Sequence, residues 1–138
     1  MKKAIIILFV LFAGCTSSYD KANEAVENIK TAQSSIDGLM QKADYKKAVQ
    51  VAAADSRMGM VITDAPTANW YGSDYINYLK NSGDTLTANC LKEISLHQLR
   101  ISANKIIFEQ EIINVSDAAK QLSLLQKFDR VYVLRIKK

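Results

Sequence analysis

Apolar residues recur every three or four positions through most of this chain, which is the spacing of one face of an α-helix. Asp20 is a suitable N-cap for the first predicted helix. Its apolar stripe consists of Ala22, Ala25, Ile29, Ala32, Ile36, Leu39 and Ala43. These are also the a and d positions of about three heptads, so a coiled coil between chains is a second interpretation. Because four of the seven residues are Ala, the seam is thin, and we expect packing within one domain.

Two shorter helices are predicted next along the chain. One runs from Asp44 to about Ser56, and the other follows Pro66, which suits a first helical turn, and ends at Gly83. The second of these helices carries Trp70, Tyr71, Tyr75, Ile76, Tyr78 and Leu79. Between the two helices, Met58–Thr63 is a short apolar run with β-branched residues, and it is compatible with a strand.

The longest predicted helix has Asp84 as its N-cap and extends from Thr85 to about Val115. One narrow face holds Leu86, Cys90, Ile94, His97, Ile101, Phe108, Ile112 and Val115. Much of the remaining circumference holds Leu91, Leu96, Leu99, Ala103, Ile106, Ile107 and Ile113. A helix that is apolar nearly all round is typically buried, so we predict that this is the central helix. A second interpretation makes Ile94–Ala103 two strands before a turn at Asn104.

A last helix is predicted after Ser116, which would be its N-cap. Its apolar residues are Ala119, Leu122, Leu125 and Phe128. The fold class is therefore mainly α, a small helical bundle with a long central helix. A variant of this prediction adds a short two-stranded element, in which Met58–Thr63 pairs with the β-branched segment Val131–Ile136.

The beginning of the chain has a different pattern. Lys2 and Lys3 precede an uninterrupted apolar run from Ala4 to Ala13, which Gly14 and Cys15 follow. A basic start before about ten apolar residues is typical of a secretory leader, and the run is too short to span a bilayer. The small residues directly before Cys15 resemble the lipobox of bacterial lipoproteins.

This resemblance implies cleavage between Gly14 and Cys15, with a diacylglycerol on the Cys15 sulfur and a further acyl chain on its amine. No other cofactor is implied. More than one acyl chain gives stable membrane attachment, because a single chain holds only marginally. Thr16, rather than Asp, follows the cysteine. In Gram-negative lipoproteins this implies an outer-membrane location facing the periplasm.

Composition limits the number of domains and the kinds of partner. Removing 14 residues from 138 leaves 124, enough for one small domain. We therefore divide the chain into a signal peptide, residues 1–14, a short tether, residues 15–19, and a single helical domain, residues 20–138. Without Lys2 and Lys3 the chain has 16 Lys and Arg against 14 Asp and Glu, a net charge of +2. This weak charge does not indicate nucleic-acid binding.

Candidate catalytic and metal-binding residues are few. If Cys15 is lipidated, Cys90 is the one remaining cysteine of the sequence, and His97 is its one histidine. Both residues lie on the same face of the longest predicted helix. Seven residues of helix separate them by about 10 Å, too far for proton transfer. One Cys and one His are also too few ligands for zinc. No glycine-rich phosphate loop or Gly-x-Ser-x-Gly motif is present. We predict no catalytic residue, no metal site and no enzymatic activity.

The aromatic helix contains the candidate partner-binding residues Trp70, Tyr71, Tyr75 and Tyr78. Tyrosines four and three positions apart form either the core face of a helix or an exposed surface for a protein partner. The functional prediction is a lipid-anchored, exported envelope lipoprotein that acts as a non-catalytic accessory or adaptor for an envelope protein. The alternatives are an immunity or exclusion lipoprotein that blocks an incoming factor and, third, an envelope enzyme.

Overall fold

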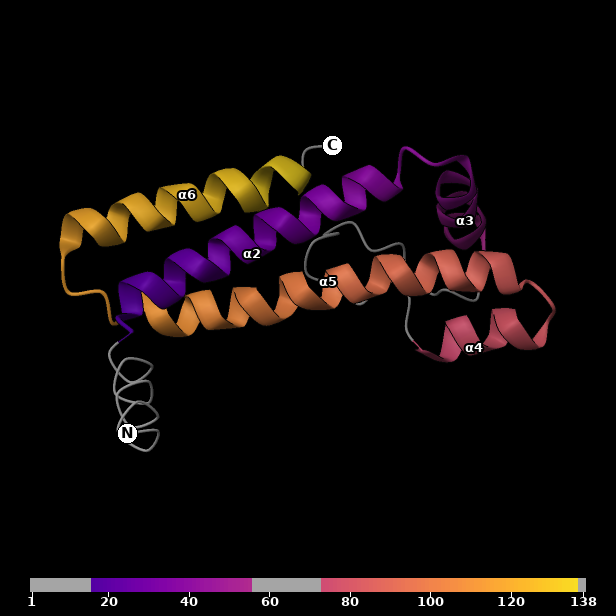
Figure 1. Ribbon diagram of the computed structural model, residues 1–138, viewed down its shortest axis with the longest axis horizontal. Coiled ribbons are helices and arrows are strands. Elements are labelled where there is room, and N and C mark those ends of the chain that lie inside the picture. The colour runs from indigo at the N-terminus through magenta and orange to yellow at the C-terminus, as the bar shows by residue number, and fades with distance from the viewer. Residues whose placement is uncertain (1–15, 56–72, 137–138) are drawn as a thin grey trace, which may run out of the picture.

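The computed structural model describes residues 16–55 and 73–136, and five helices account for nearly all of them (Figure 1). They are α2 (Ser18–Leu39), α3 (Ala43–Ala54), α4 (Ser73–Asn81), α5 (Thr85–Ile112) and α6 (Ala118–Ile136). No strand occurs among these described residues. The prediction of a mainly α bundle with a long central helix is confirmed. The predicted leader, Cys15, Met58–Thr63, Trp70 and Tyr71 lie outside the described residues.

Helix α5 organises the bundle. With 28 residues it is the longest described helix, and α2, α3 and α4 all pack against it. Helix α2 runs alongside α5, whereas α3 and α4 lie near the beginning of α5 (Figure 1). Helix α6 packs mainly along α2. The central position that the sequence predicted for this helix is therefore confirmed.

Side-chain caps determine where two of the helices begin. The Ser17 hydroxyl oxygen accepts the backbone N–H of Asp20 at 3.1 Å, so α2 begins two residues before Asp20. Asp20 lies in the first turn of α2, and our assignment of Asp20 as the cap was wrong. The Asp117 carboxylate accepts the N–H of Lys120 at 3.0 Å, and it takes the capping role that we predicted for Ser116. Each helix thus begins within a few residues of its predicted start, but the side chain that accepts the free N–H group belongs to a residue near the predicted cap.

The turn between α4 and α5 matches its predicted residues. Gly83 has a φ of +92°, a left-handed conformation that strongly favours glycine. The Asp84 N–H donates to the Leu79 carbonyl at 2.9 Å, and the Gly83 N–H donates to the Lys80 carbonyl at 3.1 Å. These two bonds form a Schellman motif. The Asp84 carboxylate then accepts the N–H of Thr87 at 3.2 Å and caps α5, as predicted.

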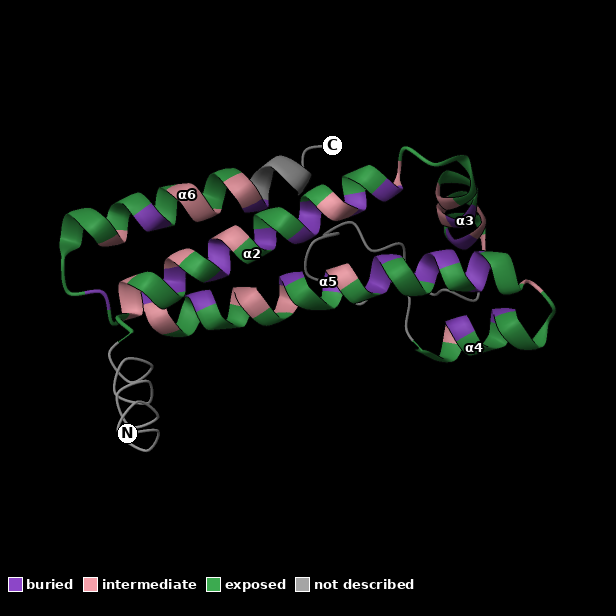
Figure 2. Cartoon of the chain, viewed as in Figure 1, coloured by how far each residue is buried: buried purple, intermediate pink, exposed green. Residues whose placement is uncertain are grey.

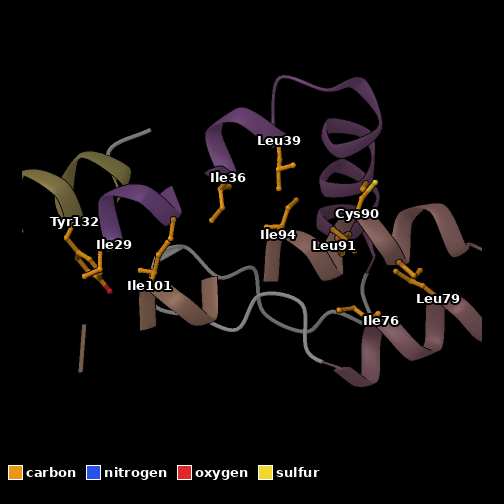
Figure 3. Packing of buried hydrophobic residues seen from close by; sticks show 14 residues of the cluster. Ile29, Ile36, Leu39, Ile76, Leu79, Cys90, Leu91, Ile94, Ile101 and Tyr132 are labelled. Carbon is orange, nitrogen blue, oxygen red and sulfur yellow. The ribbon is translucent and has the colours of Figure 1, made fainter. Parts of the chain in front are cut away.

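Two connected apolar clusters form the core, both built around α2 and α5 (Figure 2). The first joins α2, α3, α4 and α5, and Figure 3 shows Leu39 of α2 and Ile94 of α5 pointing toward one another. The second includes Phe108 of α5, which stacks on Phe128 of α6 with ring centroids 4.3 Å apart. The α2 stripe is buried by helices of its own chain, except Ala43, which is exposed at the start of α3. The intramolecular interpretation of that stripe is confirmed.

Two alternative interpretations, which gave strand character to parts of the chain, are contradicted, and the predicted helix through Ile94–Ala103 is confirmed. Val131–Ile136 belongs to α6, and Ile94–Ala103 is continuous helix in α5. Because Val131 is half-buried and Tyr132 buried in contacts with the core, packing outweighs the β propensity of this segment. The predicted apolar face of α6 was also displaced. Leu124 is buried, whereas Leu122 and Leu125 are 57% and 38% exposed.

None of the helices in the described ranges combines the length and the hydropathy needed to cross a membrane.

Candidate functional site

Helix α5 carries a row of exposed aliphatic side chains, which we call the outer stripe. Its members are Leu96, Leu99, Ala103, Ile106 and Ile113. The exposed fractions are 51% for Leu96, 44% for Leu99, 54% for Ile106 and 74% for Ile113. The prediction that α5 is buried all round is therefore wrong. One side of the helix is in the core, and another side, also apolar, is at the surface (Figure 2).

The position of the neighbouring helices explains this exposure. Successive residues of an α-helix are about 100° apart around the axis, so residues two apart lie about 160° from each other. Ile101 is fully buried and Leu99 is exposed; Phe108 is 2% exposed and Ile106 is exposed. Along this stretch of α5, α2 and α6 pack on the side that carries Ile101 and Phe108, so the outer stripe faces away from these two helices.

The spacing within the outer stripe is that of a coiled-coil seam. Its members are three, four, three and seven residues apart, which are alternating a and d positions of a heptad pattern. Gln110 occupies the remaining position, and no acidic residue interrupts the row. Such a surface can accept the apolar face of a second amphipathic helix.

Polar contacts to α2 and α6 border the stripe. Asn104 accepts a hydrogen bond from the Asn28 side chain at 3.1 Å and donates one to the Arg100 carbonyl at 2.8 Å. The Lys105 ammonium lies 3.5 Å from Glu109 and 5.6 Å from the centre of the Tyr132 ring. The fold itself holds these side chains, and the outer stripe beside them stays exposed.

The structure divides the predicted aromatic site. Tyr75 is half-buried against the core, and its hydroxyl donates a hydrogen bond to Asp55 at 3.0 Å. Tyr78 is 37% exposed, and its ring stacks on Tyr75 with centroids 6.3 Å apart. Trp70 and Tyr71 lie outside the described residues. Of the described pair, Tyr78 is the member with more surface, and a role in partner binding stays a prediction.

The pair of Cys90 and His97 does not form a nucleophilic site. Cys90 is 5% exposed, and burial, with a further contribution from Asp44, raises the pKa of its thiol. The thiol therefore stays protonated at neutral pH. The buried Nδ1 atom of His97 has no hydrogen-bond partner among the described residues, so Glu93 does not orient the ring, and the Glu93 carboxylate instead accepts a hydrogen bond from the Tyr45 hydroxyl. This bond raises the pKa of Tyr45 to about 12.

No group of three or more Cys, His, Asp or Glu side chains lies close enough to hold a metal ion within ranges 16–55 and 73–136. An open depression of about 430 Å³ lies where α2 begins, lined by residues 17–20, 114–117 and 120. Most of its lining residues are polar, and the Ser17 hydroxyl, which donates to the Asp20 carboxylate at 2.6 Å, is engaged in capping α2.

Comparison with protein-family models, curated proteins and solved structures finds no match to this chain.

Proposed function

We propose that this chain is a lipid-anchored envelope lipoprotein that catalyses no reaction and binds a protein partner through the outer stripe of α5. One observation carries the proposal: four large aliphatic side chains lie exposed in a row on the helix that also forms the domain core. Single exposed apolar side chains are ordinary on protein surfaces, whereas a contiguous apolar row marks an interaction site.

The chemistry of the stripe favours a helical partner. A row of alternating a and d positions buries the most apolar area against another amphipathic helix, because the side chains of that helix fit between those of the outer stripe. Leu96 and Leu99 are separated from Ile106 by the small side chain of Ala103, which leaves room for a larger residue of the partner. Arg100, exposed on the same stretch of helix, favours a carboxylate on the partner.

The membrane part of the proposal depends on the lipobox-like sequence that ends at Cys15. Acylation of Cys15 would hold the domain at one membrane surface, and in a Gram-negative cell Thr16 after the cysteine supports the periplasmic face of the outer membrane. A buried thiol with a raised pKa supports a binding role over nucleophilic catalysis by Cys90.

The experiment places a photoreactive phenylalanine analogue at Leu99 and, in a second strain, at Ile106 of the full-length protein. Gln126, exposed on α6, is the matched control position. We expect both α5 positions to cross-link to the same envelope protein on illumination of whole cells, with no such product from the control. A resident envelope protein supports the adaptor. A product seen only when cells meet an external factor would instead support the blocking alternative.

Substitution completes the test. Leu99→Asp should remove the Ile106 cross-link without loss of helical circular dichroism, because Leu99 is 44% exposed and contributes little to the core. Gln126→Asp should leave the product unchanged. Cross-linking of equal strength in Leu99→Asp would exclude the outer stripe as the binding surface. Separately, Cys15→Ser should release the protein from the membrane fraction, and persistent acyl labelling of that variant would exclude Cys15 as the anchor.

A further inference from the structure

Very little chain separates the proposed lipid anchor from the folded domain. Cys15 directly precedes Thr16, and α2 begins at Ser18. The link is also held at its end, because the Ser17 side chain accepts the Asp20 N–H at 3.1 Å and donates to the Asp20 carboxylate at 2.6 Å. Three extended residues span about 10 Å. An acylated Cys15 would therefore keep the first turn of α2 within about 10 Å of the lipid it carries.

The end of α5 lies at the same end of the molecule. Figure 1 shows the start of α2, the end of α5 and the start of α6 together. Lys21 of α2 forms an ion pair with Glu111 of α5 at 3.7 Å, and Lys120 of α6 lies 5.4 Å from the centre of the Tyr19 ring. The depression lined by residues 17–20 and 114–117 also joins these segments. Any surface that holds Cys15 therefore also lies near the α5–α6 loop.

Ile113 is the most exposed large apolar side chain of the described residues, at 74%. It follows the last residue of α5 and keeps right-handed helical backbone angles, φ −67° and ψ −20°. Asn114 and Val115, the next two residues, line the depression beside the start of α2. The most exposed aliphatic group thus lies close to the point where the chain would leave the membrane.

We propose that this end of the domain rests on the bilayer surface and that the side chain of Ile113, the last member of the outer stripe, enters the interfacial region, which leaves Leu96, Leu99 and Ile106 for the protein partner. The inference rests on the proposed acylation of Cys15. Because the acyl chains hold this end of the domain at the membrane, Ile113 can contact the bilayer even if its own affinity for lipid is weak. Lysines and carboxylates are mixed here, with Lys21 against Glu111 and Lys120 near Asp117. The contact should therefore not depend on anionic lipid.

If Ile113 contacts the bilayer, the beginning of α5 is the end of that helix far from the anchor. Helix α5 has 28 residues, which at 1.5 Å per residue is about 42 Å of helix. The α4–α5 turn, with Asn81 exposed beside it, lies at the opposite end of α5 from Ile113. Asn81 is therefore a matched control, because it is exposed and close to the end of a helix but far from the proposed anchor.

The test uses the full-length, acylated protein reconstituted in phosphatidylcholine vesicles, with and without phosphatidylglycerol. Ile113→Cys and, separately, Asn81→Cys are made in a Cys90→Ala background and labelled with the environment-sensitive fluorophore NBD. We expect a blue-shifted emission from position 113, quenched by doxyl groups on the lipid acyl chains, in both vesicle types. Position 81 should show neither the shift nor the quenching.

Flotation of the same vesicles separates the two hypotheses. If the protein floats with the vesicles but position 113 is not quenched, the bilayer contact is wrong and the anchor stands. If the protein does not float and carries no acyl chain, the anchor and the inference both fail. A blue shift at position 113 that persists in unacylated Cys15→Ser protein without vesicles would show that a second copy covers Ile113, and this also overturns the inference.

Discussion

Ile101 and Leu99 are two positions apart on α5, and the structure assigns them opposite roles. Ile101 is fully buried between α5 and its neighbours, whereas Leu99 is 44% exposed in the outer stripe. Replacing each with alanine in turn removes a similar volume of aliphatic side chain from the same helix. The comparison therefore measures which face of α5 stabilises the fold.

The expected magnitudes differ widely. Ile101→Ala leaves a cavity in the core, and such substitutions lower the free energy of unfolding by about 2–5 kcal/mol. Leu99→Ala removes side chain from the surface, where changes stay within about 0.5 kcal/mol, and alanine is at least as good a helix former as leucine. With a urea dependence of about 2 kcal/mol per M, in the middle of the usual range, Ile101→Ala should lower the unfolding midpoint by roughly 1–2.5 M.

The assay is urea unfolding, followed by circular dichroism, of soluble protein that lacks the leader and carries Cys15→Ser. Leu99→Ala should unfold at nearly the midpoint of the parent protein and yet weaken cross-linking from Ile106 in cells. If Leu99→Ala destabilised the protein as much as Ile101→Ala, the outer stripe would be part of the core. The proposed binding surface would then be refuted together with the description of α5 as exposed on one side.

Three further predictions concern local features of the structure. Gly83→Ala should lower stability by roughly 1–2 kcal/mol, because φ is +92° there, and its thermal midpoint compared with that of Gly38→Ala isolates the backbone effect. The pKa of Tyr45 is raised to about 12, mainly by its hydrogen bond to Glu93, so this bond stabilises the folded protein fully below about pH 10. The stabilisation is lost as the pH rises from 10 toward 12. Tyr45→Phe should therefore make the free energy of unfolding less dependent on pH in this window, and an unchanged pH dependence would contradict this. Cys90 should react with a thiol reagent far more slowly in native than in urea-unfolded protein, because burial raises its pKa, and equal rates would place the thiol at the surface.

The sequence predicted individual helices better than the contacts between them. The Gly83–Asp84 turn was predicted in full, because a left-handed glycine and a carboxylate cap act on neighbouring backbone groups. A strand at Val131–Ile136 was a variant of the predicted fold, because β-branched residues satisfy either pattern over a short length, and α6 contradicts it. Stacking of Phe128 on Phe108 and on Tyr132, at 4.3 and 5.0 Å, extends α6 through this segment.

The outer stripe was visible in the sequence as the spacing of Leu96, Leu99, Ala103, Ile106 and Ile113, but its exposure was not. A helix with two apolar faces is fully buried only when neighbours cover both, and among the described helices α2 and α6 cover the face of Ile101 and Phe108 but not the outer stripe. The sequence by itself determined where helices form and turn, because helical periodicity and capping depend on residues only a few positions apart. Only the tertiary structure decided which apolar face of α5 became core, since that depends on helices brought together from distant parts of the chain.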